Sequence, residues 1–209
     1  MVLRLVTFAI VAISLIGAAF VFEAASRTAL ALQMASSAGE SESPEVKARL
    51  LERADASLRA SWARPLAWHA GATEALSGIL LLRAEATNDP AVFDESADWA
   101  ARTVRLAPVQ PHAWTRLALL TERGHPNPIC DVVACLTKSW QVAPMIDPQT
   151  ACVRLQLAHR AAMLVRNDAR IDAYLASGVP SADAARCLNF LQPGELFETL
   201  ARHAAQAPR

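Results

Sequence analysis

Four cysteines are the side chains of this sequence best suited to covalent chemistry: Cys130, Cys135, Cys152 and Cys187. Outside the cytoplasm an even number of cysteines favours disulfides, and four allow three sets of pairings. Cys130 and Cys135 are five residues apart on one expected helix, about 140° around its axis, so they would pair only if the start of that helix unwinds. A bridge between neighbouring helices, such as Cys135 to Cys152, is geometrically easier. The other interpretation is that all four are small buried apolar side chains.

The residues that could form a metal or catalytic centre do not have suitable spacing. The series Cys130, Cys135, Cys152 and His159 lacks the close ligand pairs of structural zinc sites. Cys152 and His159 would lie two turns apart on one helix, roughly 10 Å, which is long for a nucleophile and its base. The sequence contains no phosphate-binding glycine loop, no His-Glu-x-x-His and no Gly-x-Ser-x-Gly. We therefore expect no enzyme activity, no cofactor, no metal and no small-molecule substrate.

The composition is typical of a helical protein without affinity for nucleic acid. The 209 residues are 53% hydrophobic, have a formal net charge of zero and include only 7 glycines and 1 tyrosine. Abundant alanine, leucine and arginine favour helices, and no stretch alternates as a strand would. The length allows one domain with appendages, and the balanced charge provides no basic face for nucleic acid. We predict an all-α fold.

An uncharged apolar run covers residues 5–22, which as a helix would span roughly 27 Å of hydrocarbon. It continues without a break into a more polar stretch, so we predict a transmembrane helix with a juxtamembrane extension over residues 1–35. The alternative is a cleaved signal peptide, with Arg4 as the basic residue and a small-residue site at Gly17-Ala18-Ala19. Arg4 and the terminal amine place the N-terminus in the cytoplasm. We therefore expect a single-pass protein of the bacterial inner membrane with a periplasmic soluble domain.

A small, polar and acidic segment follows the apolar helix. Residues 36–44 contain almost no apolar side chain that could stabilise an ordered structure, so we expect a flexible linker there. Ser43 is suited to cap a helix, with Pro44 at its first position and Glu45 in its first turn, where the helix dipole favours an anion. The soluble domain is expected to begin at residue 45.

Helical periodicity continues through the soluble domain. Phe93, Ala97, Ala101 and Val104, for example, are spaced by four, four and three residues, as on one buried helical face. The short connections carry proline, glycine or asparagine, and short connections between helices favour antiparallel neighbours. The sequence therefore predicts an array of antiparallel α-hairpins. Its helices are expected near 45–60, 65–86, 91–106, 111–123, 128–142, 148–165, 168–177, 181–191 and 194–206.

The segment Leu-Ala-Pro at 106–108 followed by Pro-His-Ala-Trp at 111–114 and by Leu117 resembles the tetratricopeptide repeat (TPR) family. Altered forms of this segment occur around Pro65 and Pro148, and the resemblance covers roughly residues 54–165. Ala118 replaces the family's glycine, and Trp68 and Trp114 are 46 residues apart, against a repeat of 34. The resemblance implies a TPR-like solenoid with degenerate repeats over 45–165 and a helical cap over 166–209. Trp114 would then pack between helix pairs.

The same resemblance implies that the first helix of each pair lines a concave groove for a protein partner. That groove has few lysines and arginines, so we do not expect it to clamp a peptide carboxylate. The alternative is that this face is solvated or covered by the C-terminal helices. The implied partner-binding residues are His69, Thr73, His112, Thr115, Leu119, Glu122, Gln149, Gln156 and His159.

These observations predict a membrane-anchored scaffold for protein–protein interaction in the bacterial cell envelope. It would recruit or organise components of an assembly process such as polysaccharide export, cytochrome maturation or division. The alternative is a structural accessory subunit, held in a larger inner-membrane complex through its transmembrane helix.

Overall fold

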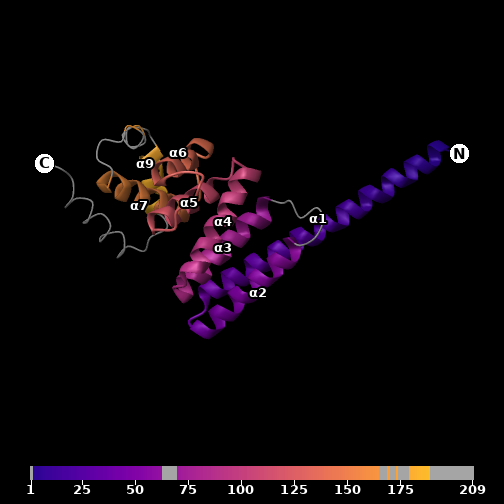
Figure 1. The fold of residues 1–209 in the computed structure, drawn as a ribbon, viewed down its shortest axis with the longest axis horizontal. Coiled ribbons are helices and arrows are strands. Elements are labelled where there is room, and N and C mark those ends of the chain that lie inside the picture. The colour runs from indigo at the N-terminus through magenta and orange to yellow at the C-terminus, as the bar shows by residue number, and fades with distance from the viewer. Residues whose placement is uncertain (1, 63–69, 165–168, 170–172, 174–178, 189–209) are drawn as a thin grey trace. The chain divides into compact units, whose positions relative to one another are not determined.

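The computed structural model describes residues 2–62, 70–164, 169, 173 and 179–188. Within these residues the regular structure is helical and there is no strand, which confirms the all-α class. The chain divides into two compact units, Met1–Pro108 and Val109–Arg209, and each is described by itself (Figure 1). The division expected between residues 165 and 166 falls outside the described residues.

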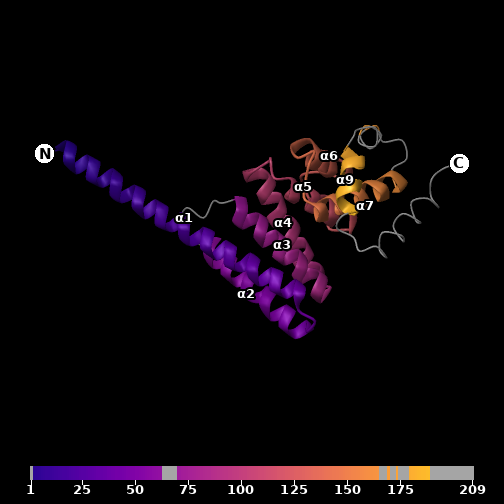
Figure 2. The ribbon, with the colours of Figure 1, turned by 180° about the vertical axis from the view of Figure 1, so that it is seen from behind.

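In its described residues the first unit contains four helices, each packed against the next along the chain. They are α1 (Val2–Glu40), α2 (Pro44–Trp62), α3 (Ala70–Thr87) and α4 (Pro90–Leu106), and α1 also contacts α3. Short connections make successive helices antiparallel. The N-terminal half of α1 extends well beyond the other three helices, as both views of the ribbon show (Figures 1 and 2).

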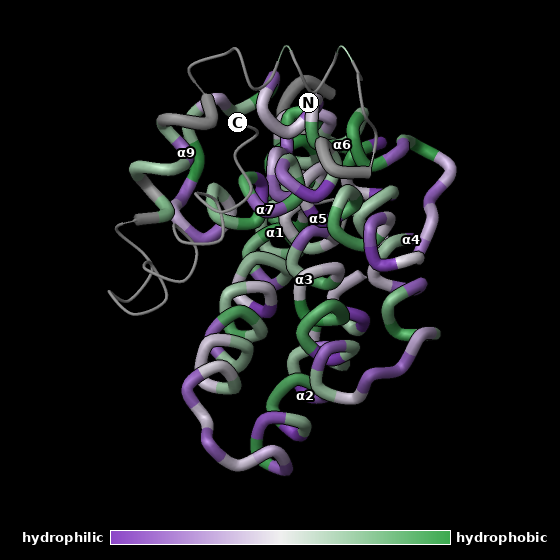
Figure 3. The backbone as a smooth tube through the Cα atoms, turned by 90° about the vertical axis from the view of Figure 1, so that its left-hand side faces the viewer, coloured by the Kyte–Doolittle hydropathy of each residue, from purple (hydrophilic) through white to green (hydrophobic). Residues whose placement is uncertain are grey.

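The segment expected to be a flexible linker is largely helical, so that prediction was wrong. Helix α1 continues to Glu40, and the chain reverses over only three residues, 41–43. Ala38 is buried at 1% exposure because α2 packs over it, and this contact stabilises helix in a stretch whose own composition does not. The tight turn between α1 and α2, at the lower end of the tube in Figure 3, carries hydrophilic residues.

Prolines and polar caps determine where most helices begin. Pro44, Pro90, Pro111 and Pro148 are the first residues of α2, α4, α5 (Pro111–Glu122) and α7 (Pro148–Leu164). Proline suits this position because its fixed φ is helical and the missing N–H would have no helical partner. The Ser43 hydroxyl accepts a hydrogen bond from the Val46 amide at 3.3 Å. The helix start predicted at Ser43 and Pro44 is confirmed.

The core of the first unit is formed where α1, α2 and α3 meet. Leucines and isoleucine of α2 and α3 pack against small residues of α1, and Trp99 of α4 joins the same cluster. One buried carboxylate, Asp55, lies in this unit and receives hydrogen bonds from Arg59 at 2.6 Å and Arg83 at 2.9 Å. Because both oxygens of Asp55 are paired, its burial leaves no uncompensated charge.

The second unit contains α5, α6 (Val132–Val142), α7 and α9 (Val179–Leu188). Helix α5 packs on α6 and α7, α6 contacts α7, and α9 packs on α7. Helix α6 begins four residues later than expected, because the Asp131 carboxylate accepts the Ala134 amide at 2.7 Å and caps the helix there. The helix expected at 194–206 lies outside the described residues.

Candidate partner-binding surface

The two threonines expected on an open face are buried instead. Thr73 is fully buried between α3 and α4, where the Thr103 hydroxyl donates a hydrogen bond to its oxygen at 2.9 Å. Thr115 lies between α5 and α6, with its hydroxyl 2.7 Å from that of Ser139 and 3.0 Å from the Pro111 carbonyl. Hydroxyl groups paired in this way are tolerated in a helix interface. Their assignment to an exposed surface was therefore wrong.

The other predicted partner-binding residues, except His69, belong to α5 and α7 of the second unit, and His69 lies outside the described residues. Gln149 and Gln156 on α7 are exposed, whereas the remaining side chains are half-buried. Arg160 of α7 donates to both carboxylate oxygens of Glu122 on α5, at 3.0 and 3.1 Å, so the two helices present neighbouring side chains. We call this set the α5/α7 surface: His112, Leu119, Glu122, Gln149, Gln156 and His159. Its binding of a partner stays a prediction.

His112 links the start of α5 to the start of α7. Its Nδ1 lies 3.0 Å from the Thr150 hydroxyl and 3.5 Å from an Asp147 carboxylate oxygen. Asp147 also accepts the Thr150 amide at 2.9 Å and so caps α7. Burial raises the pKa of Asp147, but the hydrogen bonds from Thr150 and the charge of His112 outweigh it and lower the pKa below its ordinary value. His112 therefore has a structural contact as well as a half-exposed ring.

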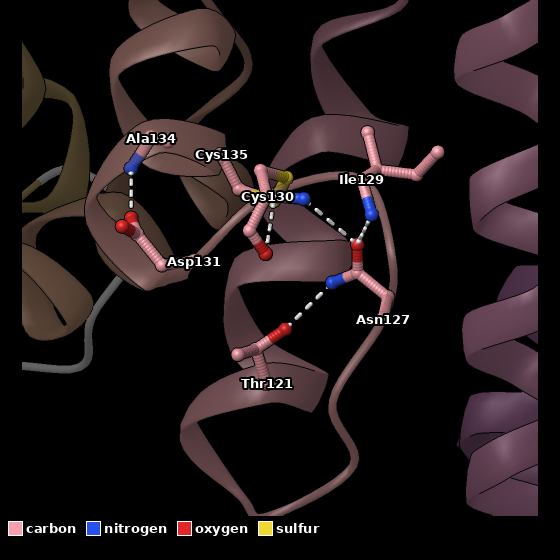
Figure 4. Close-up of a disulfide and its surroundings, with 7 residues drawn as sticks. All are labelled: Thr121, Asn127, Ile129, Cys130, Asp131, Ala134 and Cys135. Carbon is pink, nitrogen blue, oxygen red and sulfur yellow. Dashed lines mark hydrogen bonds between the residues drawn. A yellow bond between two sulfur atoms is a disulfide. The ribbon is translucent and has the colours of Figure 1, made fainter.

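The first disulfide joins Cys130 to Cys135, contrary to the expected bridge between Cys135 and Cys152. The pairing arises because α6 begins only at Val132, so Cys130 lies in the preceding loop and its Cα is 5.4 Å from that of Cys135. In the same loop, Asn127 accepts the amides of Ile129 and Cys130 and donates to Thr121, at 2.9, 3.1 and 2.7 Å (Figure 4). Asn127 therefore holds this loop to the end of α5, and the disulfide holds it to the first turn of α6.

The second disulfide joins Cys152 of α7 to Cys187 of α9, with Cα atoms 4.8 Å apart. Because all four cysteines are paired, none is a free apolar thiol, and Cys152 is not available as a nucleophile for His159. Within the part of the chain that the structure describes, no three histidine, cysteine or acidic residues gather as metal ligands.

A buried ion pair that the sequence pattern does not reveal lies beside the second disulfide. The Arg154 guanidinium donates to both oxygens of Asp183, at 2.9 and 2.7 Å, and both side chains are 0% exposed. Arg154 also donates to the Ala143 carbonyl at 2.7 Å, which connects α9 and α7 to the end of α6. This is the fork geometry of a bidentate pair. The sequence could have indicated this ion pair only if Cys152 and Cys187 were already known to be bonded, because that disulfide brings the helices of Arg154 and Asp183 together.

No known protein family, curated protein or solved structure matches this chain.

We predict that replacing one member of the buried pair is far more damaging than replacing both. Arg154→Met leaves the Asp183 carboxylate buried without its partner and should lower the free energy of unfolding by about 3–5 kcal/mol. Arg154→Met combined with Asp183→Leu should recover most of that loss, because no uncompensated charge remains. Thermal and denaturant unfolding of the full chain in detergent would measure both.

The matched control for this prediction is Arg160→Met, which breaks the more exposed pair with Glu122. It should change the free energy of unfolding by less than about 1 kcal/mol. Equal losses for Arg154→Met and Arg160→Met would contradict the buried pair.

Proposed function

We propose that this chain is a single-pass, membrane-anchored scaffold of the bacterial cell envelope. Its α1 helix would cross the inner membrane, and its TPR-like helical domain would bind protein partners in the periplasm. In this proposal the protein is not an enzyme and holds no cofactor. Its work would be to recruit or organise components of an envelope assembly process, such as polysaccharide export, cytochrome maturation or division.

The observation that carries the proposal is the contrast between the two halves of α1. Large apolar side chains protrude from its first half, with Phe8 80% and Ile13 70% exposed, and no residue between 6 and 23 is buried. One window of this helix is long and apolar enough to cross a membrane. Exposing so much contiguous apolar surface to water is unfavourable, and a bilayer would cover it. A signal sequence has similar hydropathy, but here the same helix continues into the folded core, which supports a retained anchor.

The paired cysteines support a location outside the cytoplasm. Disulfides persist in oxidising compartments such as the periplasm and are rare in the cytoplasm. Arg4, before the apolar run, agrees with an N-terminus on the cytoplasmic side. Both features favour a periplasmic domain after α1.

The packing of neighbouring helices in pairs supports an interaction scaffold. Consecutive helices α1 to α4 pack on one another, as do α5 to α7, which is compatible with a TPR-like array. Such arrays present side chains of successive helices to a long ligand. In the second unit the α5/α7 surface provides exposed amides on Gln149 and Gln156 for polar contacts.

The second candidate function is that of an accessory subunit held through α1. Gly17 lies on the apolar half of this helix, and a methyl group placed on it would meet nothing within 4 Å. With Ser14 and Ala18 it provides small residues against which another transmembrane helix could pack closely. In that case the protein would be extracted in gentle detergent as part of a stoichiometric complex.

The topology of the proposal is tested with the full chain. A reporter that is active only outside the cytoplasm, fused after Arg209, should be active, and the protein should stay in the membrane after a carbonate wash. Intact-mass measurement should find residues 1–22 still attached. Activity of a cytoplasm-only reporter would reverse the orientation, and release by the wash with loss of those residues would indicate a cleaved signal.

Partner binding is tested by crosslinking in intact membranes followed by mass spectrometry. A Gln149→Ala, Gln156→Ala variant should remain folded and membrane-bound but recover at least about tenfold less of the partner that the wild type recovers. The matched control, Glu52→Ala with Arg53→Ala, changes two exposed residues of α2 and should recover the partner normally. Unchanged recovery with the Gln149→Ala, Gln156→Ala variant would exclude the α5/α7 surface, and attention would move to α1.

A further inference from the structure

The first unit begins almost immediately where the apolar half of α1 ends. Helix α2 returns antiparallel to α1 after a three-residue turn and is 19 residues long. At equal rise per residue, its last residue, Trp62, reaches about the level of residue 22 of α1. The burial agrees, since Ala24 is the first buried residue of α1 among residues 6–40. The folded bundle therefore starts within about one turn of the apolar run.

The C-terminal ends of α2 and α4 lie together at this end of the unit. Both helices run antiparallel to α3, and an aromatic contact joins the last residue of α2 to α4 about two turns before α4 ends. The rings of Trp62 and Trp99 meet edge to face, with centroids 5.4 Å apart. The Arg102 guanidinium lies 4.8 Å from the centre of the Trp99 ring. Trp62 therefore lies beside the start of the last two turns of α4, about 10 Å along that helix from Leu106.

The side chains at this end are aromatic, cationic and apolar. Trp62 is half-buried, Arg102 and Arg105 are exposed in the last two turns of α4, and Leu106 is 50% exposed at its end. We call these four residues the base of the first unit. The combination matches the interface of a bilayer, where tryptophan lies at headgroup level and arginine binds lipid phosphate while its stem stays in apolar surroundings.

The other charged groups near the base largely neutralise one another or lie farther from this end. Glu23 and Arg27 form an ion pair at 2.8 Å on α1, and Arg59 pairs with Asp55 and Glu95. On α4 the nearest carboxylate is Asp98, about one turn before Arg102 and just outside the last two turns. On α3, Glu74 is about one turn beyond the first residue. The last two turns of α4 are therefore locally cationic.

We propose that the base contacts the headgroups of the same membrane that α1 crosses, with anionic phospholipids as its ligand. This inference rests on the proposed anchor. Arg102 and Arg105 bind lipid phosphates, Trp62 lies in the interfacial layer, and Leu106 dips toward the acyl chains. Two contacts, α1 and the base, then fix the tilt of the first unit on the membrane surface, which a single helix crossing alone would not do.

The experiment uses the full chain reconstituted into vesicles of phosphatidylcholine alone or mixed with phosphatidylglycerol, each with lipids brominated near the headgroup. Quenching that is present in the wild type and lost in Trp62→Phe reports the position of the Trp62 ring. It should be strong in the anionic vesicles and weaker in the neutral ones. Arg102→Gln with Arg105→Gln should weaken it in anionic vesicles toward the neutral level, since each arginine contributes about fivefold to the contact equilibrium.

The matched control is Arg49→Gln with Arg53→Gln, which removes two exposed charges of α2 that are nearer the turn with α1. It should leave the quenching of Trp62 unchanged. An unquenched Trp62 in vesicles that retain the protein after a carbonate wash would overturn the base contact alone, as expected if this surface bound a protein. Equal quenching in both lipids that does not depend on Arg102 and Arg105 would overturn the anionic ligand. Release of the protein by the wash would overturn the anchor together with this inference.

Discussion

The packing of α1 onto α2 is the constraint on which the first unit depends. Ala24, Ala31 and Ala38 recur every seven residues on one face of α1, and all three are buried. Residues at this spacing stay on one side of a helix, and alanine lets the neighbouring backbone approach closely. The N-terminal half of α1 is apolar and exposed, and its C-terminal half packs in the core of the first unit. In the proposed orientation one continuous helix crosses the membrane and enters the folded domain. The hinge that the polar composition of residues 36–44 indicated does not interrupt it.

The second unit is stabilised differently, by two disulfides and a buried ion pair. Cys152–Cys187 and the Arg154–Asp183 pair fasten α9 to α7, and Cys130–Cys135 fastens the loop before α6. A disulfide reduces the conformational entropy of the unfolded chain. A buried ion pair is strongly destabilised if one charge loses its partner. Disulfides persist in an oxidising environment, which is consistent with the proposed periplasmic location.

Features coded by neighbouring residues were predictable, and features that depend on distant contacts were not. Pro44, Pro90, Pro111 and Pro148 mark helix starts because proline acts on its own backbone. The helical state of residues 36–40 depends on α2 covering Ala38, which composition does not reveal. The late start of α6 at Val132 decided the pairing of Cys130, and the burial of Thr73 and Thr115 depended on hydroxyl partners on the next helix. The α5/α7 surface could be placed on its helices, but its partner is not coded locally.

We propose that α1 is one continuous helix that joins the membrane to the folded core. Hydrogen–deuterium exchange of the full chain in lipid nanodiscs measures this directly, because amides of a packed helix exchange slowly and those of a hinge exchange rapidly. A continuous helix should give protection without a gap from the apolar run through Ala24 and Ala31 to Ala38. A rapidly exchanging stretch between residues 23 and 38 would contradict it, since the anchor and the domain would then be separate bodies joined by a flexible link.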